Sequence, residues 1–172
     1  MRVEVLADVD AVALAGARWL AAEARSTVAR RGRFTRAVSG GRTPWQMFRS
    51  LAREDVPWAR VHLFQVDERV ASAGDADRDL THIRQSLLAG AAPAPVDLHP
   101  MPVDDPDLAA ASARCARDLE RVAGSPPVLD VLHLGLGADG HAPTAPPGEP
   151  RARSGMKPGR VVAVAKGHAG RG

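Results

Sequence analysis

The chain has 172 residues, of which 45% are hydrophobic, and this length and composition fit one globular domain with a single core. Its only cysteine, Cys115, excludes an intrachain disulfide, and no apolar run approaches the ~20 residues that a membrane span requires. Residues 1–5 lead directly into an alternating apolar pattern without a signal-peptide core. We therefore expect a cytoplasmic protein that has no membrane partner.

The charge is divided unevenly along the chain. Six of the 23 basic residues and none of the 20 acidic ones lie in residues 151–172, so residues 1–150 are mildly acidic although the net charge is +3. This distribution argues against nucleic-acid binding by the body of the protein. Prolines and the loss of apolar periodicity after His141 predict an α/β domain over residues 1–150 and a basic, disordered tail over residues 151–172.

Strand-like and helix-like apolar patterns alternate along the first 140 residues. Such alternation predicts an α/β fold with three layers, in which a mostly parallel, doubly wound, Rossmann-like sheet is connected by right-handed crossovers. The predicted strands cover residues 3–6, 34–38, 61–66, 98–101 and 128–134, and the predicted helices begin near residues 8, 44, 80 and 107.

Three unusual clusters directly follow predicted strands, namely Ser39–Thr43, Asp67–Arg69 and Gly135–His141. In open parallel sheets, ligands bind outside the carboxyl ends of the strands. The three clusters are therefore expected to meet in one site.

The first cluster has the composition of an anion-binding turn. Gly40 and Gly41 allow the backbone to approach a ligand closely, while Ser39 offers a hydroxyl and Arg42 a charge. The positive end of the following helix adds free backbone N–H groups. An ordinary strand-to-helix turn is the alternative interpretation.

The start of that helix is predicted from its capping residues. Thr43 is expected to be the N-cap, Pro44 to occupy the first helical position, and Gln46 to complete a capping box.

The second cluster, Asp67-Glu68-Arg69, has two interpretations. It is either a solvated run of charges or a pair in which Asp67 and Arg69 face the cleft. In the second case one side chain would hold substrate hydroxyls or water, and the other would supply positive charge to a phosphate or an oxyanion.

The third cluster formally matches a dinucleotide-binding G-x-G-x-x-G pattern, but the prolines that follow exclude the helix that this fingerprint requires. His141 is a candidate general base, with a solvent-exposed loop histidine as the alternative. The other strand and helix histidines show no metal-ligand spacing, so no metal is predicted; they are His62, His82, His99 and His133.

Together the clusters resemble the 6-phosphogluconolactonase family. Its phosphate loop S-G-G-x-T-P is similar to residues 39–44, its W-x-x-V-H…D-E-R segment to residues 58–69, and its G-L-G-x-D-G-H turn to residues 135–141. The resemblance implies hydrolysis of 6-phospho-glucono-1,5-lactone to 6-phosphogluconate without a metal or an organic cofactor. It also implies that His141 activates water, that Arg69 and Asp67 position the substrate, and that Ser39, Gly40, Gly41, Arg42 and Thr43 hold the phosphate.

The sequence departs from that family in three places. Ala142 and Pro143 replace residues of its D-G-H-T-A-S-L segment, and Asp79 stands where an asparagine is expected. The family's later strands and its phosphate-binding lysine have no match. We hypothesise that a frameshift or premature end replaced the segment after His141, which would lower the activity well below that of the family; translation of the other reading frames tests this.

Two other functions remain open. The glucosamine-6-phosphate deaminase family shares the fold, although it typically has D-E-Y where this chain has Asp67-Glu68-Arg69. The other is an inactive protein that binds sugar phosphates. The sequence leaves the oligomeric state open, with a monomer as one option.

Overall fold

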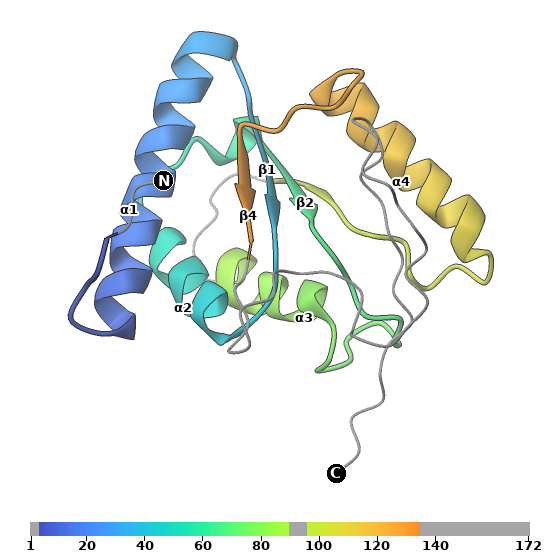
Figure 1. Cartoon of the computed structure of the whole chain (residues 1–172), viewed down its shortest axis with the longest axis horizontal. Helices are drawn as coiled ribbons and strands as arrows, with labels where there is room; N and C mark the ends of the chain where they lie inside the picture. The colour runs from blue at the N-terminus through green and yellow to red at the C-terminus, as the bar shows by residue number, and fades with distance from the viewer. Residues whose placement is uncertain (1–3, 90–95, 135–172) are drawn as a thin grey trace.

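The computed structural model describes residues 4–89 and 96–134 of the chain. Figure 1 shows a parallel sheet with helices on both sides. The helices are α1 (Val9–Arg31), α2 (Arg42–Leu51), η1 (Trp58–Arg60), α3 (Asp79–Ile83), the π-helical η2 (Arg84–Leu88) and α4 (Leu108–Ala123). The strands are β1 (Phe34–Val38), β2 (Val61–Gln65), β3 (Asp97–His99) and β4 (Val131–His133), in the spatial order β3-β2-β1-β4.

The helices divide between the two faces of this sheet and form three layers, as predicted. The larger core packs α1, α2, α3 and η2 against one face, where it contains Phe34, Phe48 and Leu63. The smaller core packs α4 against the other face through Ala37 and Phe64. The predicted three-layer α/β class with a parallel Rossmann-like sheet is therefore confirmed (Figure 1).

Strand β1 lies between β2 and β4, and all five of its side chains are buried. It pairs in parallel with both neighbours, so that Val38 lies opposite Gln65 on one side and His133 on the other. The helices cover the strand on both faces, so even its two polar residues, Thr35 and Arg36, are buried.

Arg36 brings a charge into this core. Arg36 is 2% exposed, its guanidinium carbon lies 5.6 Å from the centre of the Phe48 ring, and burial lowers the pKa of Arg36 to about 10. Burial, with a smaller contribution from Arg36, lowers the pKa of the neighbouring His133 to about 4, which keeps that imidazole neutral.

Helix α1 has a local capping signal at each end. The Asp8 carboxylate accepts a hydrogen bond from the amide of Ala11 at 2.7 Å, and Gly32 closes the helix in the left-handed conformation with φ 76°. Its buried face is mostly alanine, which allows close packing on α2, where a Cβ at Gly16 would lie 2.8 Å from the Met47 sulfur. Val9 and Val12, although apolar, are exposed.

Two predicted strands differ in the structure. Residues 4–6 form no strand, and Val5 is 89% exposed. The last strand is shorter than predicted and only partly buried, because β4 comprises three residues and Leu132 is 54% exposed. An alternating apolar pattern does not specify whether a neighbouring strand or helix is present to bury it. No helix in the described part of the chain is long and apolar enough to cross a membrane.

The core on the α1 side predicts a large difference between two aromatic residues. Phe48 is fully buried whereas Trp19 is 57% exposed on α1. We expect Phe48→Ala to lower the free energy of unfolding by about 3–5 kcal/mol because it leaves a cavity, and Trp19→Ala to change it by less than about 0.5 kcal/mol. Urea denaturation followed by circular dichroism measures both, and equal losses would contradict this assignment of the core.

Candidate functional site

The residues that follow β1 and β2 leave the sheet from the same edge. The amide of Val66 donates to the carbonyl of Val38 at 2.9 Å, which extends the pairing to the ends of both strands. The amide of Ser39 donates to the carbonyl of His133 at 3.2 Å, so β4 also ends there. All three predicted clusters therefore follow strands whose carboxyl ends lie at one edge.

Two of these clusters are in direct contact. The Ser39 hydroxyl donates to Oδ1 of Asp67 at 3.3 Å, and the Arg69 guanidinium donates to Oδ2 of the same carboxylate at 3.2 Å. The Arg69 side chain is 53% exposed and that of Asp67 is 31% exposed, so both present polar atoms to solvent. Of the two interpretations of this cluster, the structure shows the ion pair of Asp67 with Arg69. The third cluster, including His141, lies outside the described residues.

The start of α2 differs from the capping prediction. Gly41, with φ 118°, is the N-cap, and the helix begins at Arg42 without a side-chain cap. Thr43 is therefore not the N-cap, Pro44 is the third helical residue, and the side-chain amide of Gln46 contacts Asp10 of α1 instead of forming a capping box. Gly41 can adopt a positive φ, and this allows the helix to begin directly after it, before Thr43. Arg42 and Thr43 are exposed in the first turn, where backbone amides have no acceptor within the helix.

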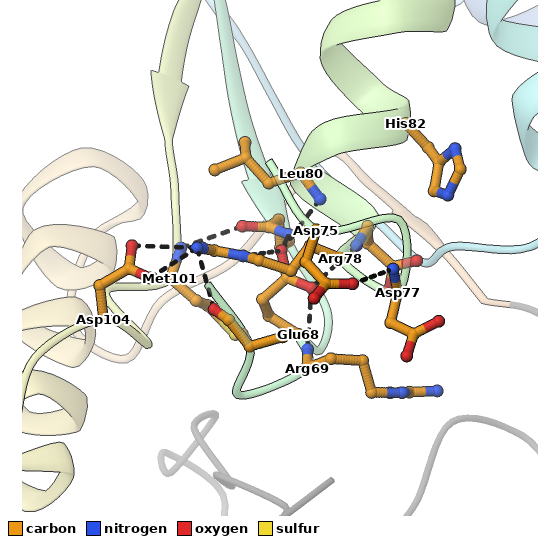
Figure 2. Close-up of polar contacts among 12 residues, drawn as sticks. Glu68, Arg69, Asp75, Asp77, Arg78, Leu80, His82, Met101 and Asp104 are labelled. Carbon is orange, nitrogen blue, oxygen red and sulfur yellow. Dashed lines mark hydrogen bonds and ion pairs between the residues drawn. The ribbon is translucent and has the colours of Figure 1, made fainter. Parts of the chain in front are cut away.

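Glu68 behaves differently from the two residues beside it. It is 5% exposed and points away from solvent, into a network shown in Figure 2. Its carboxylate accepts four hydrogen bonds of 2.8–2.9 Å, two of which come from the first amides of α3, where the helix dipole favours a negative charge. The donors are Gln65 Nε2 and the backbone amides of Arg69, Asp79 and Leu80.

Arg78 extends this network to the loop after β3. Its side chain is 2% exposed, its Nε lies 3.7 Å from Glu68, and its Nη1 donates to both oxygens of Asp104 at 2.7 and 3.0 Å (Figure 2). Gln65 adds a second connection, because its Oε1 accepts from the amide of Met101 at 3.0 Å. The sequence did not reveal this support, since a single arginine in a polar loop carries no signal of burial.

Asp79 lies against the glycine turn. A Cβ at Gly40 would overlap the Asp79 carboxylate, so this side chain fills the space that the glycine leaves open. Burial, and then the negative charges of Asp67 and Glu68, raise the pKa of Asp79 to about 6. The site thus holds a carboxyl group with a raised pKa next to the turn that was predicted to bind an anion.

Comparison with known proteins identifies the family of the chain. The family model described as glucosamine-6-phosphate isomerases/6-phosphogluconolactonase matches residues 7–170. The chain belongs to this family. Its relatives include a 6-phosphogluconolactonase from Synechocystis sp., 35% identical over 127 residues, which cover 72% of this chain and 53% of that protein.

Solved structures of the family share the fold. A 6-phosphogluconolactonase from Shewanella baltica superposes with a TM-score of 0.69 and 26% identity over 80% of this chain and 57% of that one. A monomeric glucosamine-6-phosphate deaminase superposes with a TM-score of 0.67 at 20% identity, over 83% of this chain and 58% of that one, which shows the common fold alone. The chain spans a little over half the length of these relatives.

The Glu68 network predicts which carboxylate the site requires for stability. Glu68→Ala would leave Arg78 beside a cavity and four hydrogen-bond donors without their acceptor, so we expect a loss of about 3–5 kcal/mol in the free energy of unfolding. Asp104→Ala is the matched control, because Asp104 is 57% exposed and Arg78 would keep Glu68; its loss should be about 1 kcal/mol or less. Chemical denaturation measures both values, and a reversed order would contradict the network.

The raised pKa of Asp79 predicts how stability depends on pH. Because the folded pKa of about 6 exceeds the ordinary value of 3.8, the native state binds this proton more tightly than the unfolded state does. The ionised carboxylate therefore lowers stability above pH 6, and the cost disappears as the pH falls from 6 to 4. After allowance for solvent screening, we expect Asp79→Asn to be more stable by about 1–2 kcal/mol at pH 8.

Unfolding curves of both proteins at pH 4 and pH 8 test this expectation. The difference in stability between the wild type and Asp79→Asn should nearly vanish near pH 4, where both side chains are uncharged in the folded state. A constant difference across this range would show that Asp79 has an ordinary pKa.

Proposed function

We propose that this chain carries the site of a 6-phosphogluconolactonase, which hydrolyses 6-phospho-glucono-1,5-lactone to 6-phosphogluconate. The observation that supports this most directly is the contact of Ser39 and Arg69 with the two oxygens of Asp67, which joins two of the predicted clusters at one edge of the sheet. This arrangement places a hydroxyl, a carboxylate and a guanidinium within reach of one small polar ligand.

Each of these groups suits one part of the reaction. Arg69 uses one nitrogen for Asp67, and its exposed remaining N–H groups are available for the phosphate or for the oxyanion that forms at the lactone carbonyl. Asp67 holds Arg69 in place and accepts hydrogen bonds from substrate hydroxyls. Ser39, Gly40, Gly41, Arg42 and Thr43 are proposed to bind the phosphate at the first turn of α2.

His141 is proposed to complete the reaction as the general base. It takes a proton from water, whose oxygen attacks the lactone carbonyl carbon. The bond from that carbon to the ring oxygen then breaks, and the proton passes from His141 to the departing oxygen. The product is the open-chain acid.

Two predictions from the sequence have no test in the structure. They are a cytoplasmic location and a domain boundary at residue 150.

Asp79 bears on how well the phosphate is held. In its ionised form it places a negative charge against Gly40, where the resemblance leads us to expect a neutral amide. Repulsion between this carboxylate and a phosphate would weaken substrate binding above pH 6. The same negative charge would weaken the binding of any phosphorylated sugar, including the substrate of a deaminase.

The proposal is tested by assaying the purified chain for 6-phosphogluconate formation, with spontaneous lactone opening subtracted. We expect catalysed hydrolysis, and a decrease of about 10²-fold in kcat/KM for Arg69→Ala through loss of a charged contact made in the transition state. Arg49→Ala, an exposed arginine in the last turn of α2, is the matched control and should retain wild-type activity.

The other outcomes are distinct. Ammonia release from glucosamine 6-phosphate would assign the chain to the deaminase branch of the family. A rise in melting temperature with 6-phosphogluconate, without turnover of the lactone, would identify a binding protein.

A further inference from the structure

Another group of polar side chains lies away from the proposed site, on the face of the sheet that α4 covers. His62 on β2 lies directly opposite Asp97 on β3, and His99 follows two residues later on the same face. The His99 ring stacks on Phe64 at 4.2 Å, and Phe64 belongs to the core beneath α4. The pairing of two parallel strands thus brings together residues that are far apart in the sequence.

Three potential ligand atoms converge in this cluster. His62 Nδ1 lies 3.0 Å from Asp97 Oδ2 and 3.2 Å from His99 Nε2, and His99 Nε2 lies 3.5 Å from Asp97 Oδ2. In a tetrahedral zinc site with bonds of 2.0–2.1 Å, neighbouring ligand atoms are about 3.3–3.4 Å apart. The three separations therefore match those of zinc ligands.

A fourth residue fixes the orientation of His99. Its Nδ1 lies 2.5 Å from Asp118 Oδ2 of α4, so the proton of the neutral imidazole is held on Nδ1 and the lone pair of Nε2 is directed at the cluster. A carboxylate behind a histidine is the usual support of a zinc ligand. Burial of the His99 side chain, which is 8% exposed, keeps this arrangement rigid.

We propose that His62, Asp97 and His99 bind a zinc ion, with Asp118 as the positioning residue behind His99. Two imidazole nitrogens and one carboxylate oxygen favour zinc over magnesium or calcium, which prefer oxygen ligands. The Asp97 side chain is 60% exposed, so water has access to a fourth coordination position. The ion would connect β2, β3 and α4, and thereby fasten the short edge strand β3 to the sheet.

This proposal is independent of the lactonase function. His62 is the second residue of β2, whereas the proposed active site follows the last residue of that strand. It also differs from the sequence-based expectation of no metal, which considered only the spacing of histidines along the chain.

The experiment is a zinc titration of the untagged full chain after dialysis against a chelator, using calorimetry and thermal unfolding. We expect one zinc ion per chain and a melting temperature that rises with zinc concentration. Asp118→Asn should weaken the affinity about 10–100-fold through misorientation of His99. His62→Gln and Asp97→Asn each remove a ligand, so they should abolish the stoichiometric site.

Three control variants separate this site from other zinc ligands. His82→Gln removes a histidine that stacks on Trp45 instead, Cys115→Ser removes the only thiol, and His141→Asn removes the proposed catalytic base. All three should bind zinc as the wild type does.

The test uses variants of His62 and Asp97, which are partly exposed, because replacement of the buried His99 can unfold the chain. Cobalt provides a spectroscopic readout, since four-coordinate cobalt absorbs visible light strongly and the bands should disappear in His62→Gln. The proposal is overturned if the wild type binds no zinc, or if His62→Gln and Asp97→Asn bind it unchanged; the cluster would then be a hydrogen-bonded network that shares protons.

Discussion

The buried negative charge of Glu68 is the constraint on which the candidate site depends. A carboxylate that is removed from water is tolerated only where donors and a cation compensate it. Here the compensation comes from the end of β2, the first turn of α3 and the guanidinium of Arg78. Since all of these groups must converge on Glu68, the chain around it has little freedom. The positions of Asp67 and Arg69 on either side follow from that.

The sequence predicted the parts of the structure that depend on local patterns. The apolar runs located β1 and β2, the residues Asp8 and Gly32 fit the ends of α1, and the order of elements led to a parallel sheet with its ligands at one edge. From these features the proximity of the Ser39 turn to Asp67 could be inferred before any coordinates. The contact between Ser39 and Asp67 confirms that inference.

Other features depended on tertiary contacts that no local pattern encodes. No separate role was predicted for Glu68, the middle one of three successive charged residues, yet it is turned inward while Asp67 and Arg69 are turned outward. Thr43 had the residue type of an N-cap, but the backbone of Gly41 began the helix before it. His62 and His99 are 37 residues apart, and only the register of β2 with β3 brings them together. Strand pairing and side-chain direction were the missing information in each case.

The overlap between Gly40 and Asp79 links two positions that are distant in the sequence. As long as residue 79 carries a carboxylate or an amide of similar size, residue 40 has no room for a side chain. The two positions are therefore expected to vary together: in a selection from a randomised library, alanine at position 40 would survive only beside a shortened residue 79. If a sugar phosphate needed more space beside the Ser39–Thr43 turn, such paired changes at positions 40 and 79 could provide it, but a change at either position alone could not.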